Sequence, residues 1–73
     1  MKRTRLKYLR NKKGLLQPEL AKLLEIPSRQ YGRIERGELS LTIPICIKLV
    51  RILGVEHMED ILEEEELLSE VPQ

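Results

Sequence analysis

Apolar residues recur along most of the chain at intervals of three or four positions, the spacing that gathers side chains on one face of an α-helix. Alternating apolar and polar positions, which mark a strand, form no useful run, because Pro44 interrupts the isoleucine-rich stretch at 41–47. The pattern therefore predicts an all-α fold of five short helices. Their expected ranges are about 3–13, 17–24, 28–36, 42–54 and 57–69.

Glycine and capping residues mark the ends of these segments. Gly14 and Gly54 each follow an expected helix, a position at which glycine commonly ends one. Thr42 carries a hydroxyl that can cap the start of the fourth helix. We expect residues 1–69 to form a single domain and residues 70–73 to form a frayed tail.

Composition limits the kinds of protein that the chain can be. At 73 residues it is one small domain, too short for a typical nucleotide-binding enzyme fold. Its single cysteine, Cys46, excludes an intrachain disulfide and a cysteine-clustered zinc site, and its apolar neighbours indicate a buried side chain. The acidic run Glu63–Glu66 points around all sides of a helix and cannot hold one catalytic carboxylate pair. We therefore expect a solvated acidic face, no enzyme activity, no metal and no cofactor.

Charged residues are divided unequally between the two halves of the chain. Residues 1–37 contain eleven Lys or Arg and three Glu, whereas residues 38–73 contain two Lys or Arg and nine Asp or Glu. A basic half of this kind favours contact with a polyanion, with the acidic half facing elsewhere. Chance, together with matching of helix dipoles, explains the asymmetry equally well, so charge alone does not identify a ligand.

The stretch from residue 14 to residue 37, GLLQPELAKLLEIPSRQYGRIERG, predicts two short helices joined by a turn of three or four residues. This is the geometry of a helix-turn-helix. Apolar side chains let the two helices pack together: Leu20, Ala21, Leu24, Ile26, Tyr31 and Ile34. The second helix keeps five polar residues outside that core: Ser28, Arg29, Gln30, Arg33 and Arg36. Arg pairs with the edge of guanine and Gln with that of adenine, so this surface suits base reading.

The same stretch resembles a known family. The segment QPELA at 17–21, followed by Ile26 and by RIERG at 33–37, is similar to the Cro/CI-type (XRE-like) helix-turn-helix family. The resemblance covers roughly residues 6–62 and places the helix-turn-helix at about 17–36. It implies a compact five-helix, lambda-repressor-like DNA-binding domain, usually dimeric, whose third helix enters the major groove.

The resemblance also implies roles for individual residues. The base-reading residues would be Arg29, Arg33, Ser28 and Gln30. The phosphate contacts would come from Gln17, Arg36, Ser40 and Arg3. Arg10 would pair with Glu35 and tie the first helix to the third. Both residues of that pair lie on otherwise apolar faces, where an unpaired charge is costly.

Several positions depart from the family pattern. Leu16 and Pro27 stand where the family often has a Ser or Thr cap, so these helix starts lose an oxygen worth about 1 kcal/mol. Glu25 replaces a common turn glycine, so a left-handed backbone there would be somewhat strained. Gly32 lies inside the expected recognition helix. It either lets the backbone approach DNA or is tolerated at a cost of about 1 kcal/mol relative to Ala.

Apolar residues beside the expected core stripe predict a self-association surface. Ile45 and Ile52 share a face of the fourth helix, and the fifth segment carries Met58, Ile61 and Leu62 on one stripe. Branched apolar residues exposed together favour contact with a second copy of the chain. A wider edge of the core explains Ile45 and Ile52 equally well.

These observations together predict a sequence-specific DNA-binding transcriptional regulator. We expect a homodimeric repressor of phage, mobile-element or small-operon type that acts on a two-fold site in double-stranded DNA. No 18-residue apolar run and no signal peptide are evident, so a cytoplasmic, nucleoid-associated prokaryotic protein is expected. Two alternatives stay open. One is an antitoxin-like module whose acidic C-terminal helix, about 57–69, binds a basic partner protein, and the other is a restriction-modification controller.

Overall fold

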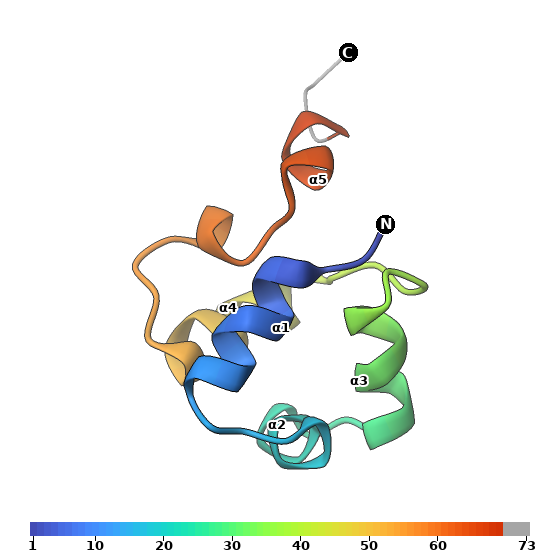
Figure 1. Cartoon of the computed structure of the whole chain (residues 1–73), viewed down its shortest axis with the longest axis vertical. Helices are drawn as coiled ribbons and strands as arrows, with labels where there is room; N and C mark the ends of the chain where they lie inside the picture. The colour runs from blue at the N-terminus through green and yellow to red at the C-terminus, as the bar shows by residue number, and fades with distance from the viewer. Residues whose placement is uncertain (70–73) are drawn as a thin grey trace.

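The computed structural model of the chain describes residues 1–69, which form five α-helices and one 3₁₀-helix and contain no strand. The elements are α1 (Thr4–Lys12), α2 (Gln17–Leu24), α3 (Ser28–Glu35), α4 (Ile43–Leu53), η1 (Met58–Asp60) and α5 (Glu64–Ser69). Figure 1 shows α1 to α4 around a common centre, with α5 at one end of the molecule near the N-terminus. The all-α prediction is confirmed. The expected tail at 70–73 lies outside the described residues.

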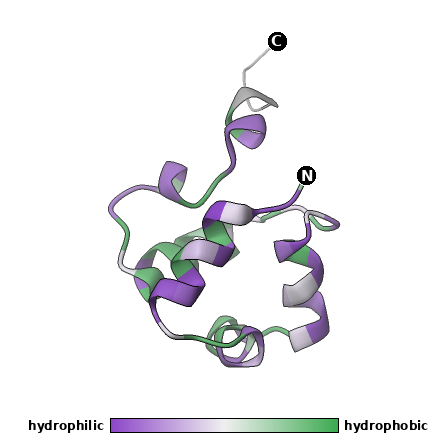
Figure 2. Ribbon diagram, in the orientation of Figure 1, coloured by the Kyte–Doolittle hydropathy of each residue, from purple (hydrophilic) through white to green (hydrophobic). Residues whose placement is uncertain are grey.

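The core is aliphatic apart from one tyrosine, because the chain has no Phe and no Trp. Hydrophobic residues are concentrated along α4 and on the inner sides of the other helices (Figure 2). Burial of each large apolar side chain contributes roughly 1.5–3 kcal/mol to folding. The fully buried residues of this cluster are Leu6, Leu20, Ala21, Leu24, Tyr31, Ile34, Leu49, Leu53 and Ile61.

The helix ends follow the local sequence. The Thr42 hydroxyl accepts the backbone N–H of Ile45 at 3.4 Å and caps α4. Leu16 supplies no capping side chain to α2, but the Glu19 carboxylate accepts the Leu16 N–H at 2.8 Å and compensates for part of that loss. Glu25 ends α2 with φ at 61°, the left-handed conformation that the missing turn glycine would have adopted more easily.

The connection after α3 passes close to the start of the chain. Gly37 has φ at +80°, and a Cβ at this position would overlap the carbonyl group of Met1. Glycine is therefore required here both by the backbone conformation and by the close approach of a second segment. This contact brings the N-terminus against the C-terminal end of α3.

The expected continuous helix at 57–69 is wrong, because the structure divides it into η1 and α5. Ile61, which follows η1, has no exposed surface and fills the core. The Glu66 carboxylate then accepts the Glu63 N–H at 3.0 Å and starts a new helix at Glu64. Residues 61–63 therefore lie outside both helices, with Ile61 packed in the core and the bond from Glu63 to Glu66 opening a separate helix.

The acidic run is not the wholly solvated face that we expected. The Glu63 carboxylate accepts the Thr4 hydroxyl at 2.9 Å and the Arg5 N–H at 3.1 Å. Glu66 binds the guanidinium of Arg3 at 2.9 Å. Glu64 and its neighbour at 65 are exposed. Positions 63 and 66 are one helical turn apart, so both point at the N-terminal segment.

Candidate nucleic-acid interface

The outer face of α3 carries the residues expected to read bases. Ser28, Arg29 and Arg33 are exposed, and Gln30 is half-buried. On the opposite face, Tyr31 and its neighbours at 34 and 35 are buried against the core. Arg29, Gln30 and Arg33 also line a shallow hollow of about 450 Å³ together with Pro27 and Leu39. Arg29, Gln30 and Arg33 therefore lie together around one accessible hollow, and Ser28 is exposed at the start of the same helix.

Two arginines at the end of this face share one carboxylate. Glu38 accepts from Arg36 Nε at 2.8 Å and from Arg33 Nε at 3.3 Å, and all three side chains are about half exposed. The hydrogen bond from Arg36 holds the pKa of Glu38 below its ordinary value, and the pairing raises the pKa of Arg36. Arg29 has no ion-pair partner within residues 1–69. Glu38 thus pairs with two of the exposed guanidinium groups at this end of α3.

A buried carboxylate holds α3 against α1 and α2. Arg10 Nε donates to Glu35 Oε2 at 2.8 Å and Arg10 Nη2 donates to Oε1 at 3.1 Å. The Tyr31 hydroxyl donates to the same carboxylate at 2.6 Å, and Gln17 Nε2 donates at 3.0 Å. Arg10 also reaches the Leu15 carbonyl at 2.7 Å. The pair expected at Arg10 and Glu35 is therefore present as the centre of a four-residue network.

The network shifts the ionisation of its members. Burial alone would raise the pKa of Glu35, but hydrogen bonds from Arg10, Tyr31 and Gln17 outweigh it and hold this pKa below its ordinary value. The bond to Glu35 raises the pKa of Arg10. Burial, followed by donation to Glu35, raises the pKa of Tyr31. The carboxylate is charged and the phenol protonated at neutral pH, as the observed hydrogen bonds require.

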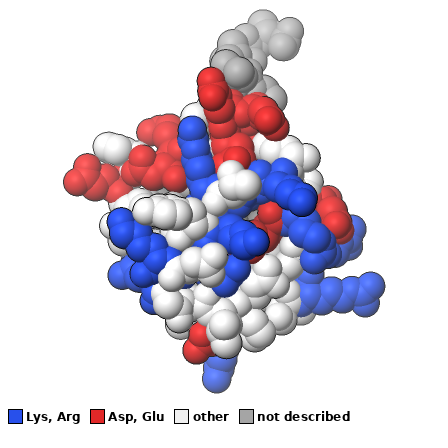
Figure 3. All heavy atoms as spheres, viewed as in Figure 1, with Lys and Arg blue, Asp and Glu red and all other residues white. Residues whose placement is uncertain are grey.

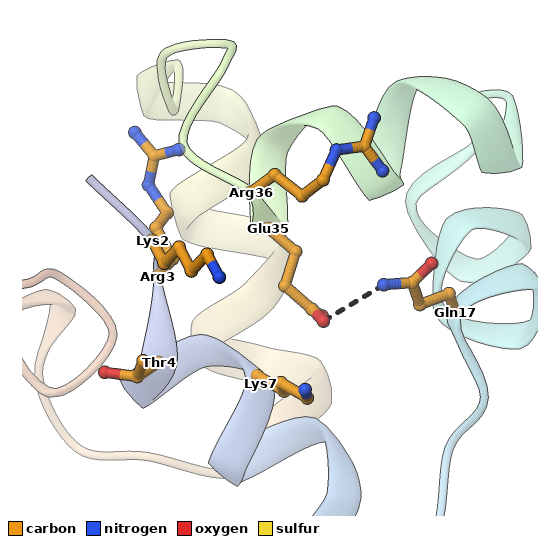
Figure 4. Close-up of a pocket in the computed structure, with 7 residues that line it drawn as sticks. All are labelled: Lys2, Arg3, Thr4, Lys7, Gln17, Glu35 and Arg36. Carbon is orange, nitrogen blue, oxygen red and sulfur yellow. Dashed lines mark hydrogen bonds between the residues drawn. The ribbon is translucent and has the colours of Figure 1, made fainter.

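A basic pocket lies between the start of α1, the start of α2 and the end of α3. Lys2, Lys7 and Arg36 line it, with Gln17 and Glu35 at its base, and its volume is about 290 Å³. Figure 4 shows the Gln17 amide directed at Glu35, with the lysines on the α1 side and Arg36 on the α3 side. Because Gln17 begins α2, its backbone N–H is among the first groups of that helix and lacks an acceptor one turn earlier. Such N–H groups and lysines are the donors that bind phosphate.

Gly32 is buried in α3 beside this pocket. A Cβ at Gly32 would lie 3.3 Å from Arg36 Nη1 and 3.5 Å from Gln17 Oε1. The second distance is an ordinary contact, and a small movement of the flexible Arg36 side chain relieves the first. Of the two explanations given by the sequence, these distances favour simple tolerance of the glycine.

The expected phosphate contact at Arg3 is wrong. Arg3 is only 3% exposed, and its guanidinium binds Glu66 and two backbone carbonyls inside the protein. It contributes little surface to the basic pocket, and the printed contacts use four of its five N–H groups inside the protein. Ser40 is exposed in the connection between α3 and α4, as a phosphate contact requires.

Figure 3 shows the charge distribution over one face of the molecule. Lys and Arg side chains cover much of the surface over α1 and α3, and Asp and Glu side chains gather around η1 and α5. The asymmetry seen along the sequence is therefore also an asymmetry in space. Glu38 lies beside Arg33 and Arg36 and is an acidic exception on the basic side.

The residues expected at a dimer interface differ in how deeply the structure buries them. Ile61 is fully buried in the core of its own chain, so its assignment to the interface is wrong. Ile45 and Ile52 are half-buried and pack against the edge of the core, and Met58 and Leu62 are also half-buried. Sequence reasoning missed the two exposed large hydrophobic residues of α4, Ile43 at 65% and Ile47 at 43%. Their four-residue spacing was the signal that could have revealed them.

Sequence reasoning also missed Lys2 and Lys7 in the basic pocket, and Glu38 as the partner of two arginines. The excess of basic residues in the first half of the chain was a general signal for the lysines. Nothing in the sequence singled out Glu38, because the bend that returns it to Arg36 is visible only in the structure.

Comparison with known proteins identifies the family. A family model described as "Helix-turn-helix" matches residues 6–59, which is most of the chain. The chain belongs to this family. The match confirms the resemblance to Cro/CI-type (XRE-like) proteins, and places the chain among DNA-binding regulators and not among enzymes.

Two kinds of relative are similar to the chain. The HTH-type transcriptional regulator RamB of two Mycobacterium tuberculosis strains is 32% identical over 53 residues, which are 73% of this chain and 11% of RamB. An uncharacterized HTH-type transcriptional regulator of Methanothermobacter thermautotrophicus is 34% identical over 59 residues, 81% of this chain and 86% of its own length. The chain thus spans about a tenth of RamB and most of the second relative. No solved structure matches the chain significantly.

Residues 1–69 contain no helix that is long and apolar enough to cross a membrane. No group of three or more His, Cys, Asp or Glu side chains in this part of the chain is arranged to hold a metal ion. Cys46 is buried in α4.

Proposed function

We propose that the protein is a sequence-specific repressor that binds double-stranded DNA as a homodimer. The single observation that carries the proposal is the group of Arg29, Gln30 and Arg33 around one open hollow, on a helix that begins with exposed Ser28 and whose other face is anchored in the core. Long polar donors on a rigid helix are suited to reading base edges in the major groove.

The basic pocket supplies the complementary, sequence-independent part of the interaction. Lys2 and Lys7 attract the phosphate backbone, and Gln17 is held by Glu35 with its second amide N–H available to a phosphate oxygen. Arg36 and Ser40 extend the same edge. Contacts of this kind fix the register of α3 in the groove and make the affinity depend on salt.

Dimerisation would place two copies of α3 on one side of the DNA. We assign the contact to the half-buried residues Ile45, Ile52, Met58 and Leu62, which lie between the core and the solvent. In a dimer that binds successive major grooves, the two recognition helices are about 34 Å apart, one turn of B-DNA. A repressor then acts by occupying a promoter, for which no domain beyond a DNA-binding unit is needed.

The decisive experiment is selection of bound duplexes from a random DNA pool, followed by sedimentation of the protein with and without the selected duplex. We expect a two-fold site with half-sites about one helical turn apart, bound by two protein copies. A selected pool with no common sequence would contradict base reading. A selected site without symmetry, bound by one copy, would contradict the dimer but not the reading helix.

Repression is tested separately by placing the selected site over a reporter promoter. Expression of the protein should lower reporter output, and a site with one half scrambled is the matched control. Increased output would identify an activator of the restriction-modification controller type. Unchanged output with intact binding would indicate that occupancy alone does not regulate transcription.

A further inference from the structure

Arg3 is the most deeply buried cation among residues 1–69, with 3% of its surface exposed. All three nitrogens of its guanidinium donate hydrogen bonds. Nε and Nη2 bind the Glu66 carboxylate, with Nη2 2.9 Å from Oε2. Nη1 donates to the carbonyls of Ile34 at 2.6 Å and Leu39 at 2.7 Å. Burial of a charge is costly unless it is paired in this way, so these bonds hold the side chain in place.

The atoms that accept hydrogen bonds from Arg3 lie at the end of α3, in the connection that follows it and at the start of α5. Ile34 lies in the last turn of α3, where carbonyl groups lack a partner within the helix, and the Arg3 N–H donates to the next carbonyl, that of Glu35, at 3.0 Å. A cation at this end also has the favourable sign for the helix dipole. Glu66 is the residue whose carboxylate accepts the Glu63 N–H and so starts α5. One guanidinium therefore joins the end of the recognition helix to the start of α5.

A second set of contacts between the same segments does not involve α3. Glu63 binds the Thr4 hydroxyl and the Arg5 N–H, and the Arg5 guanidinium donates to the Leu62 carbonyl at 2.8 Å. The Arg5–Glu63 ion pair is long, at 4.0 Å, and Arg5 is about half exposed. Solvent and salt weaken such a pair far more than the shielded pair of Arg3 and Glu66. These contacts hold α5 on α1 and provide a control for the role of Arg3.

We propose that Arg3 is a positioning residue for base reading. By bonding the last turn of α3, the following connection and α5 at once, it sets the angle at which α3 presents Arg29 and Arg33 to DNA. Docking of α5 and accurate reading of bases are thereby linked, because both depend on the same guanidinium. The inference rests on the proposed DNA-binding function and assigns to Arg3 a role that differs from phosphate contact.

The test compares Arg3→Ala and Glu66→Gln with the matched control Glu63→Gln, which disturbs the contact of α5 with α1 without touching α3. Two quantities are measured at a temperature where each variant is folded: the ratio of affinities for the selected site and a scrambled duplex, and amide hydrogen exchange at Gly37, whose N–H bonds the Ile34 carbonyl. We expect Arg3→Ala to lower the affinity ratio by about tenfold, the value of one misplaced base contact, and to speed exchange at Gly37. Glu66→Gln should act in the same direction but less strongly, and Glu63→Gln should change neither quantity.

Several outcomes overturn the proposal. A folded Arg3→Ala variant with the wild-type ratio and wild-type exchange excludes a positioning role, and equal losses in Glu63→Gln and Glu66→Gln assign the effect to α5 docking in general. A uniform loss on both duplexes, with unchanged exchange, would restore Arg3 as a phosphate contact.

If Arg3→Ala does not fold, Glu66→Gln decides, and a wild-type ratio in that variant overturns the proposal. Failure of the wild-type protein to prefer any duplex would contradict the proposed function instead. Exchange at Gly37 would then still test the hold of Arg3 on α3.

Discussion

Glu35 and Glu38 lie three residues apart at the end of the recognition helix, and each binds arginine, but their surroundings give them opposite roles. Glu35 is buried with Arg10 and accepts hydrogen bonds from Tyr31 and Gln17 as well. Glu38 is about half exposed and binds arginines that are equally exposed. In the interior, removal of one partner strands a charge, whereas at the surface water replaces it at little cost. The buried pair therefore holds the fold together, and the exposed pairs are free to exchange for a ligand.

The largest expected effect is on the stability of the fold and comes from the buried carboxylate, Glu35. Glu35→Ala leaves Arg10 without its counter-charge and should destabilise the protein by about 3–5 kcal/mol, measured by urea denaturation. The matched variant Glu38→Ala should leave the denaturation midpoint nearly unchanged. Equal effects from the two variants would mean that burial does not distinguish the two carboxylates.

The pH dependence of folding should follow the same carboxylate. The pKa of Glu35 is lower in the folded protein than its ordinary value of 4.5, so the unfolded chain takes up the proton more readily. The stabilisation from Glu35 is therefore complete above about pH 4.5 and is lost as the pH falls through the lower, folded-state pKa. Thermal denaturation of the wild type should show this loss, and Glu35→Gln should show a shallower dependence. The same slope in both proteins would assign the acid sensitivity to other groups.

The next largest effect concerns the exposed Arg33, and it is on affinity for DNA and not on stability. Arg33→Ala should weaken binding to the preferred site by about 1–3 kcal/mol and binding to a scrambled duplex by less, because it removes a base contact. Arg51, exposed on α4, provides a control with the same loss of charge. Titrations against both duplexes at two salt concentrations separate the two cases. If Arg33→Ala lowers both affinities equally, α3 contributes charge and not sequence recognition.

The smallest effect should come from removing the charge of Glu38, which pairs with Arg33 and Arg36 in the free protein. Glu38→Gln releases Arg33 and Arg36 from an exposed carboxylate and removes a negative charge beside them, so affinity for any duplex should rise about two- to fivefold at low salt. The gain should shrink at high salt, since the contact is exposed. Lower affinity in this variant would show that Glu38 orients the arginines for DNA instead of competing with it.

Local sequence signals predicted most of the fold correctly because they depend on neighbouring residues. The range of α2 at 17–24, the Thr42 cap and the end of α4 at Gly54 follow from spacing and capping chemistry within one or two turns. The contact of Arg10 with Glu35 came from the family resemblance together with the cost of an unpaired charge on an apolar face. The exposed face of α3 followed once its apolar residues were assigned to the core.

Errors appeared where residues distant in sequence decide the outcome. The segment at 57–69 has a continuous helical pattern, but the structure divides it at residues 61–63, where Ile61 packs into the core and the Glu66 carboxylate accepts the Glu63 N–H. Arg3 is a basic residue in the basic half of the chain, which suggested a phosphate contact. Its acceptors, however, are supplied by residues 31 to 63 positions away. Ile61 was expected at a dimer interface for the same reason, since periodicity does not reveal which of two apolar surfaces a side chain meets.

By itself, the sequence determined an all-α helix-turn-helix protein with a polar outer face on its third helix, because helix periodicity, capping and charge depend on neighbouring residues. Only the tertiary structure decided which charges are available to a ligand. Arg3 is buried by the Glu66 carboxylate, and Glu38 pairs with Arg33 and Arg36, none of which the sequence indicated. The physical reason is that the state of a charge depends on its desolvation and on its partners in space, and both are established only when distant segments pack together.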